Sequence, residues 1–254
     1  MLTMIRLNEF EYGGQIEKFK YEAIEKNLQE RLYILFGEAF KQKIGTLIVL
    51  EGWGASGKGD LLKTITTRLD PRKFRVYSMN SGSSDNYPFL HRYWKGLPEY
   101  GNTAILDGSW YSRVTYDKIN KLLTKKDCKN AFQSILNFEK LIQDDHYIIL
   151  KYFLNISAKE QKNRLKKAKE TEKKWMISET DWEEYENYEE YRNEFEYALN
   201  TTNTENCPWC IVSAKNKNFA KYQVMNSIIA SLEKKLNIDS NKILSLLLEE
   251  AGVS

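Results

Sequence analysis

The sequence predicts an α/β protein in which about five parallel strands form a sheet with helices on both faces. Short apolar runs alternate with longer amphipathic stretches along most of the 254 residues. The apolar runs are rich in β-branched residues, which is typical of parallel strands buried on both faces. A glycine-rich stretch follows the first run and precedes a helical one. A chain of this length can bury a sizeable core.

The elements are expected in the following order. A first helix is predicted over 15–42, with its apolar residues on one stripe: Ile16, Phe19, Ala23, Ile24, Leu28, Leu32 and Phe36. Strands are predicted near 46–50, 74–79, 103–107, 147–154 and 209–213. Helices are predicted near 57–69, 87–95, 130–144, 157–170, 181–200, 217–236 and 242–250. We interpret the whole chain, 1–254, as a single domain.

The connection between the fourth and fifth strands is longer than a crossover helix requires. Its first half is basic, with Lys162, Arg164, Lys166, Lys167, Lys169, Lys173 and Lys174. Its second half, Glu179 to Glu196, is acidic, and we expect it to form solvent-exposed helices. The basic half leaves the carboxyl end of a strand, where open α/β sheets bind ligands. The region 157–200 is therefore predicted to be a helical lid over an anionic substrate.

Composition excludes several classes of protein. No run approaches 18 apolar residues and no signal segment is evident, so a soluble, cytoplasmic protein without a membrane partner is expected. A net charge of +3 does not indicate nucleic-acid binding.

Cysteine usage leaves two interpretations open. Cys207 and Cys210 form a C-x-x-C pair, which suits a redox site or half of a zinc site. Only Cys128, His91 and His146 remain as further soft ligands. Because these are so few, we favour two small core residues at the start of a strand.

A glycine-rich loop follows the first predicted strand. Residues 51–60 read EGWGASGKGD and nearly match the phosphate-binding pattern G-x-x-x-x-G-K-[ST], although Gly59 replaces the hydroxyl residue that holds magnesium. Between a strand and a helix, the loop N–H groups and Lys58 can contact phosphate oxygens. We therefore predict a phosphate-binding loop that contains Gly52, Gly54, Ala55, Ser56, Gly57, Lys58, Gly59 and Asp60. Trp53 is expected to pack rather than to bind a ligand.

The third predicted strand ends on a carboxylate, Asp107, after an apolar run. Phosphotransfer proteins with a phosphate loop place an Asp there to hold Mg²⁺, directly or through water. Together with the loop, this predicts a P-loop kinase-like three-layer sandwich with Asp107 as the metal ligand.

Five stretches resemble, in order, the type-2 polyphosphate kinases: EGWGASGKG, AILDGSWYSR, FLNISAKEQKNRL, KKWMISETDW and CPWCIV. The tryptophan after the first loop glycine is most similar to the polyphosphate:AMP phosphotransferase branch. The resemblance covers nearly the whole chain. It implies direct in-line phosphoryl transfer between inorganic polyphosphate and a nucleotide such as AMP or ADP. It also implies Mg²⁺, or Mn²⁺ in its place, as cofactor, and a homo-oligomer.

The resemblance assigns roles to individual charged residues. Lys58 matches the loop lysine, Asp107 the Mg²⁺ carboxylate and Arg113 the arginine of S-W-Y-N-R, so these three are expected to be catalytic. Arg164 matches the arginine of the lid sequence E-Q-x-x-R, and Arg92 the arginine before L-P-x-x-G. Both are expected to bind phosphate, because guanidinium groups bind such oxygens in pairs. The alternative for each arginine is a surface ion pair.

Several positions depart from the family pattern. The family loop is G-x-D-A-A-G-K-G-G, so Gly54 replaces a metal-binding acid and Asp60 replaces a glycine. In the pattern D-R-S-W-Y-N-R, Gly108 replaces an arginine and Ser112 an asparagine, and Asp117 follows where the family has Glu. We expect Asp60 to be a first-turn helix residue. Losing a carboxylate and a cation is expected to weaken metal and phosphate binding, and restoring both is expected to raise turnover.

Three functions remain open at this point. The first is an active polyphosphate–nucleotide phosphotransferase, favoured by the lysine, aspartate and arginines above. The second is a binding or scaffold protein that keeps the fold without the chemistry, favoured by Gly54 and Gly108. The third is an ATP-dependent kinase for a nucleotide or small metabolite, which shares the loop and the lid.

Overall fold

The computed structural model describes residues 3–78, 86–172, 175 and 177–250. Five parallel strands form one sheet in the order β2-β3-β1-β4-β5. They are β1 (Gly45–Gly52), β2 (Phe74–Ser78), β3 (Thr103–Asp107), β4 (Tyr147–Asn155) and β5 (Trp209–Ser213). All five predicted strands are present. Residue 79, which the sequence placed in the second strand, lies outside the described residues.

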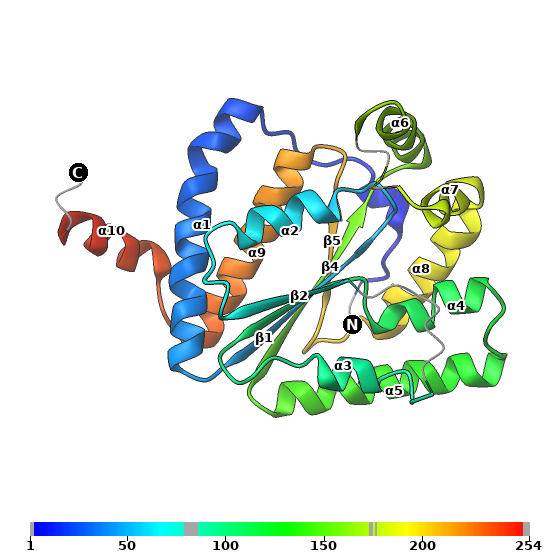
Figure 1. The fold of residues 1–254 in the computed structure, drawn as a ribbon, viewed down its shortest axis with the longest axis horizontal. Coiled ribbons are helices and arrows are strands. Elements are labelled where there is room, and N and C mark those ends of the chain that lie inside the picture. Colours follow the sequence, from blue (N-terminus) through cyan, green and yellow to red (C-terminus); the bar gives the residue numbers. More distant parts are fainter. Residues whose placement is uncertain (1–2, 79–85, 173–174, 176, 251–254) are drawn as a thin grey trace.

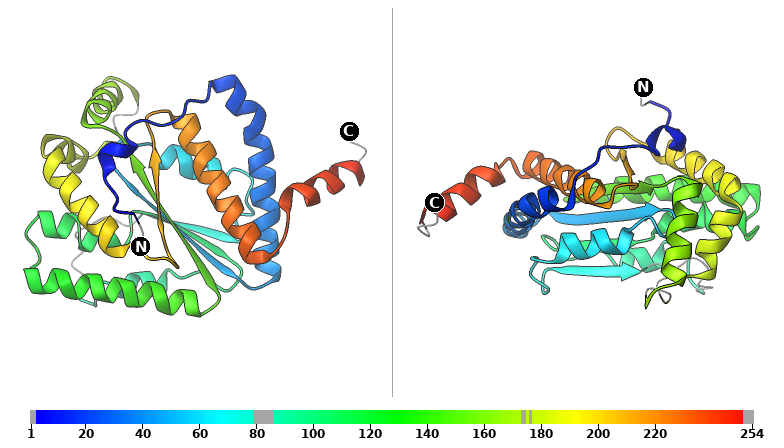
Figure 2. Two further views of the ribbon diagram at one scale, coloured as in Figure 1. Left: turned by 180° about the vertical axis from the view of Figure 1, so that it is seen from behind. Right: turned by 90° about the horizontal axis from the view of Figure 1, so that it is seen from above.

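Helices cover both faces of the sheet, which confirms the three-layer arrangement (Figures 1 and 2). One face carries α1 (Lys18–Lys41), α2 (Lys58–Thr66) and α9 (Lys217–Leu236). The other carries α3 (His91–Lys95), α5 (Lys125–Asp144) and α8 (Tyr188–Thr202). The short helices η1 (Leu7–Phe10), η2 (Trp110–Arg113) and α4 (Tyr116–Ile119) complete the body, and α10 (Ser240–Glu250) extends away from it next to α1 (Figure 1).

The register of the central strands positions the site. β1 lies between β3 and β4, and its residues Ile48, Val49 and Leu50 are fully buried, as the unbroken apolar run predicts. Leu50 pairs with Asp107, so the aspartate stands at the carboxyl edge of the sheet where β1 turns into the loop. This edge faces α6 (Ala158–Lys169) and α7 (Glu179–Glu186) (Figure 1).

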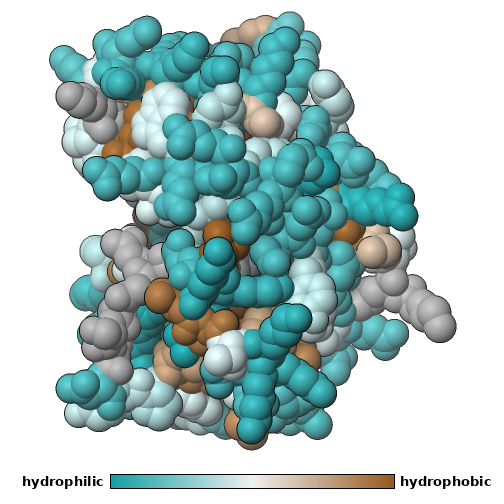
Figure 3. Space-filling model, turned by 90° about the vertical axis from the view of Figure 1, so that its right-hand side faces the viewer, coloured by the Kyte–Doolittle hydropathy of each residue, from teal (hydrophilic) through white to brown (hydrophobic). Residues whose placement is uncertain are grey.

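The acidic half of the long connection differs from the expectation. The sequence predicted one solvated helical stretch over 181–200, but Asn187 separates α7 from α8 with a backbone of φ −113° and ψ 31°. Tyr188, Tyr191 and Phe195 are buried against the sheet side of α8. The prediction of solvent-exposed helices is therefore wrong for α8, because an aromatic stripe along this helix packs into the core despite its acidic composition. The side of the molecule on which this region lies is largely hydrophilic in its upper half, with hydrophobic patches in its lower half (Figure 3).

The structure tests two expectations from composition, that the cysteines are core residues and that no segment crosses a membrane. Cys207 is buried just before β5 and Cys210 is half-buried within it, and both are free, as expected for core residues at a strand start. None of the helices in the described residues combines the length and apolar character needed to cross a membrane.

Candidate active site

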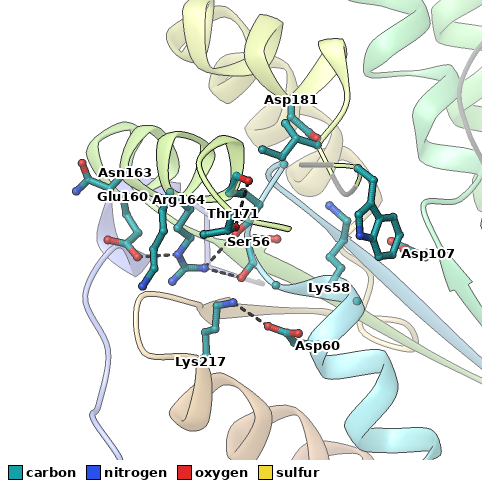
Figure 4. Close-up of a pocket in the computed structure, with 18 of the residues that line it drawn as sticks. Ser56, Lys58, Asp60, Asp107, Glu160, Asn163, Arg164, Thr171, Asp181 and Lys217 are labelled. Carbon is teal, nitrogen blue, oxygen red and sulfur yellow. Dashed lines mark hydrogen bonds and ion pairs between the residues drawn. The ribbon is translucent and has the colours of Figure 1, made fainter. Parts of the chain in front are cut away.

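A cavity of about 1130 Å³ opens at the carboxyl edge of the sheet, between the loop after β1, helix α6 and the segment after β5 (Figure 4). Lys58 and Asp107 lie on one side of it and Arg164 on the other. The cavity brings together nine of the predicted residues: Gly54, Ala55, Ser56, Gly57, Lys58, Gly59, Asp60, Asp107 and Arg164. The other three, Gly52, Arg92 and Arg113, lie outside its lining.

Glycines shape the loop. Gly52 has φ +135°, and a Cβ there would lie 2.4 Å from the carbonyl oxygen of Leu154 on β4. Gly57 caps α2 with φ +108°, a conformation that side chains disfavour. The Nζ atom of Lys58, the first residue of α2, donates to the carbonyl oxygens of Gly52 at 2.7 Å and Trp53 at 3.1 Å. The lysine ammonium is thus held inside the turn of the loop.

Trp53 packs under the loop, as the sequence predicted. Its side chain is fully buried, and its indole N–H donates to Asn155 Oδ1 at 2.9 Å. Its ring stacks on Tyr188 with centroids 4.0 Å apart. The indole therefore fixes the loop against β4 and α8.

Arg164 is already fully engaged by protein groups. Its guanidinium donates to the carbonyl oxygens of Ala55 and Ser56 in the loop and of Ala214 and Lys215 after β5, and to Glu160 Oε1. The four bonds to carbonyl oxygens tie α6 to two sides of the cavity, and the bond to Glu160 lies within α6. The geometry shows Arg164 bracing the loop, and its contact with phosphate stays a prediction.

The other two predicted arginines lie beyond the cavity lining. Arg113 pairs with the buried Asp117, with Nη1 2.9 Å from Oδ2, and its guanidinium carbon lies 5.9 Å from the ring centroid of Phe89. The guanidinium carbon of Arg92 lies 4.9 Å from the ring centroid of Tyr93. Arg113 thus forms an ion pair with a residue four positions along the chain. A catalytic role for Arg113 stays a prediction.

Asp60 lies in the first turn of α2, as expected, and forms an ion pair with Lys217 at 2.7 Å. The pair joins α2 to the start of α9 at the base of the cavity (Figure 4). The carboxylate of Asp60 thus binds a lysine in this structure, and no observation assigns it to a metal site.

A second carboxylate near Asp107 was missed from the sequence. Glu51, the last residue before the first loop glycine, accepts a hydrogen bond of 2.6 Å from the Ser109 hydroxyl. Burial raises the pKa of Glu51 to about 7, and the negative charge of Asp107 adds to this rise, while Ser109 and the ammonium of Lys58 oppose it. Glu51 could have been found from its position, because it lies near the end of β1, which pairs with β3, the strand that ends on Asp107.

The donor set is compatible with a magnesium ion that is shared with substrate. Within residues 3–78, 86–172, 175 and 177–250, no three His, Cys, Asp or Glu side chains gather to form a protein-only metal site. Mg²⁺ is commonly bound by one or two carboxylates, with water and substrate phosphates completing the shell. Asp107 lines the cavity and supplies such a carboxylate, and it lies near enough to Glu51 for its negative charge to help raise the pKa of Glu51.

The raised pKa of Glu51 predicts a pH-dependent stability effect. Glu51 is neutral in both states below about 4.5 and charged in both above about 7, so its burial lowers stability as pH rises through this window. Glu51→Gln is therefore expected to raise the free energy of unfolding at pH 8.5, by at most about 3 kcal/mol, and to change it little at pH 4.5. Urea unfolding in EDTA measures this. The exposed control Glu99→Gln should show no such difference, and an equal effect of Glu51→Gln at both pH values would contradict the assignment.

A buried ion pair supports the segment after Asp107. Lys151 on β4 and Glu139 on α5 are both fully enclosed, with Nζ 2.9 Å from Oε2. Glu139 also accepts hydrogen bonds from the indole of Trp110 at 3.0 Å and from the hydroxyl of Tyr111. The network fixes η2, which carries Arg113 at its end.

Comparison with known proteins identifies the family. The sequence profile of "Polyphosphate kinase 2 (PPK2)" matches residues 15–240. The chain belongs to this family. It is 28% identical over 229 residues to a polyphosphate:AMP phosphotransferase of Pseudomonas syringae pv. tomato, which covers 89% of this chain and 46% of that protein. It is 30% identical over 210 residues to ADP-polyphosphate phosphotransferase 3 of Rhizobium meliloti, covering 81% of this chain and 73% of the relative.

Solved structures share the fold. A polyphosphate kinase 2 from Pseudomonas aeruginosa superposes with a TM-score of 0.84 at 27% identity, over 92% of this chain and 50% of the other. One from Arthrobacter aurescens superposes with a TM-score of 0.82 at 21% identity, over 98% and 99%. The PPK2 chain described here thus spans about half the length of the two Pseudomonas proteins compared above.

Proposed function

We propose that this PPK2 chain transfers a phosphoryl group between inorganic polyphosphate and a nucleoside mono- or diphosphate. The observation that carries this proposal is the convergence of the loop, Lys58 and Asp107 with the basic residues Lys167 and Lys215 in one cavity. A site with several cations beside a phosphate loop suits a polyanionic substrate better than a neutral one. Relatives named for AMP and for ADP are about equally similar to the chain, so both acceptors are retained in the proposal.

The proposed reaction is a direct in-line displacement. An oxygen of the nucleotide's terminal phosphate attacks the terminal phosphorus of polyphosphate. The bond to the penultimate phosphate breaks, and the shortened chain leaves with the electron pair on its oxygen. Lys58 and the loop N–H groups would hold and neutralise the transferred group, so no protein nucleophile is required. Mg²⁺ held by Asp107 would supply further charge neutralisation when bound.

The decisive experiment is a substrate panel. Purified protein is incubated with polyphosphate and AMP, ADP, GMP or GDP, with Mg²⁺ or Mn²⁺, and products are quantified by chromatography. Formation of a nucleotide one phosphate longer, with no ATP present, supports the proposal. Transfer only from ATP would instead support the metabolite-kinase alternative.

A second candidate is a polyphosphate-binding protein without catalysis. It is favoured by the absence of a side chain at Gly54, where the family pattern has an acid, and by Gly108, whose φ of +75° disfavours a larger residue. Tight binding of polyphosphate with no transfer in the whole panel would support this candidate.

Substrate binding is predicted to depend on one lysine of α6 more than on its neighbour. Lys167 lines the cavity, whereas Lys166, which is also exposed, lies outside the lining. Lys167→Gln is expected to weaken polyphosphate binding several-fold at about 50 mM salt and little at about 500 mM, because exposed charges are screened. Lys166→Gln is the matched control and should have a smaller effect. Equal losses for the two variants would show that α6 acts only as a generally basic surface.

A further inference from the structure

Glu184 is a buried carboxylate that no sequence motif singled out. It lies on α7, in the stretch expected to be solvated, yet its exposed fraction is only 3%. Burial raises its pKa, while the charge of Lys58 and the hydrogen bonds from Gly54 and Tyr116 oppose this rise. A carboxylate enclosed to this degree is costly unless donors surround it.

Three donors from three different elements meet at Glu184. The N–H of Gly54, in the phosphate loop, donates to Oε2 at 2.7 Å. The hydroxyl of Tyr116, on α4 just beyond Arg113, donates to Oε1 at 2.6 Å. The amide of Gln161, on the lid helix α6, donates to Oε2 at 3.3 Å. One side chain thus joins the loop, the arginine segment and the lid.

The approach of α7 depends on the missing side chain at position 54. A Cβ on Gly54 would lie 2.2 Å from Asp181 Oδ1 and 2.9 Å from Asp181 Cβ. Asp181 has little freedom to move, because it forms a reciprocal capping box with Ser178 at the start of α7. Any larger residue at position 54 must therefore displace α7 and, with it, Glu184.

We propose that Glu184 is a positioning residue that holds the phosphate loop in its binding conformation and ties it to α4 and α6, and that Gly54 admits α7 to this place. The carboxylate accepts the Gly54 N–H and so fixes the direction of that peptide at the start of the loop. The inference rests on the proposed phosphate-binding function for its affinity readout. It also reverses the expectation from sequence for Gly54→Asp, which should now displace α7 rather than repair the site.

The test compares Glu184→Gln with Glu186→Gln, an exposed residue two positions along the same helix. Glutamine at position 184 replaces one oxygen by an NH₂ group and removes the negative charge. An NH₂ group in the place of Oε2 opposes the N–H donors of Gly54 and Gln161, and one in the place of Oε1 forces the Tyr116 hydroxyl to accept instead of donate. Calorimetry with inorganic tripolyphosphate should show about tenfold weaker binding for Glu184→Gln and none of this loss for Glu186→Gln. Hydrogen exchange of the peptide containing residues 51–57 should accelerate only in Glu184→Gln. A folded Glu184→Gln protein with unchanged affinity and unchanged loop exchange would overturn the inference.

Two further variants keep the test decisive if Glu184→Gln folds poorly. Tyr116→Phe removes one donor and leaves the carboxylate, so it should speed loop exchange to a smaller extent. Gly54→Ala adds only the Cβ and should speed exchange in α7, and protected α7 amides in this variant would contradict the steric argument. If the unmodified protein fails to bind tripolyphosphate, the proposed function fails, while the exchange measurements still decide the positioning role.

Discussion

Lys58→Ala is expected to remove nearly all phosphoryl transfer while leaving the protein folded. The Nζ atom contacts two carbonyl oxygens of the loop, those of Gly52 and Trp53, and it lies beside the cavity rather than in the core. Alanine is also a good helix former at the start of α2. The variant therefore loses a positive charge at the reacting phosphate with little loss of packing.

The expected loss is about 100- to 1000-fold in kcat, the range found when one donor to a developing negative charge is removed. The measurement is turnover at saturating polyphosphate and nucleotide, with a thermal melt to check folding. Lys63→Ala, an exposed residue on the same helix, is the matched control and should retain turnover. Lys58→Ala with normal turnover would remove the loop from the proposed mechanism.

Strong local patterns made much of the fold predictable from sequence. The bounds of β3, β5 and α9 coincide with the expected 103–107, 209–213 and 217–236. In each case an apolar run or stripe is bounded by polar residues, such as Asn216, whose side chain caps α9. The loop after β1 was also predictable from a local pattern. Two of its glycines adopt positive φ angles that other residues disfavour, so the spacing of glycines in the sequence indicates the turn.

Residues that act through distant partners were not predictable in this way. Arg164 was assigned from a motif to phosphate, and its hydrogen bonds to carbonyls of two separate loops depend on the packing of α6. Glu184 was read as part of a solvated acidic stretch, because nothing local indicates that α7 docks on Gly54. The composition of a helix indicates how exposed its residues are on average. Whether one carboxylate is buried depends on the segments that the fold packs against it.

Lys151→Met is expected to destabilise the protein strongly, by about 3–5 kcal/mol. Lys151 Nζ donates to Glu139 Oε2 at 2.9 Å, to the Tyr111 hydroxyl at 3.0 Å and to the carbonyl oxygen of Thr202 at 2.9 Å. Methionine fills a similar volume, so the loss comes from the carboxylate of Glu139, which stays buried without its counter-charge. Urea unfolding measures the change. The exposed Lys140→Met, next to Glu139 on α5, is the control and should be nearly neutral.

The double variant Lys151→Met with Glu139→Gln separates a lost ion pair from a lost packing contact. A neutral glutamine can still accept a hydrogen bond from the Trp110 indole, so the double variant is expected to be more stable than Lys151→Met alone. Recovery of stability shows that the unpaired charge caused the loss, and no recovery would assign the loss to packing.

Because the same carboxylate holds Trp110 and Tyr111 in η2, Lys151→Met should also lower turnover at temperatures where it remains folded. Arg113 ends that helix, so a fall in kcat without a change in the circular dichroism spectrum would link the buried pair to the site.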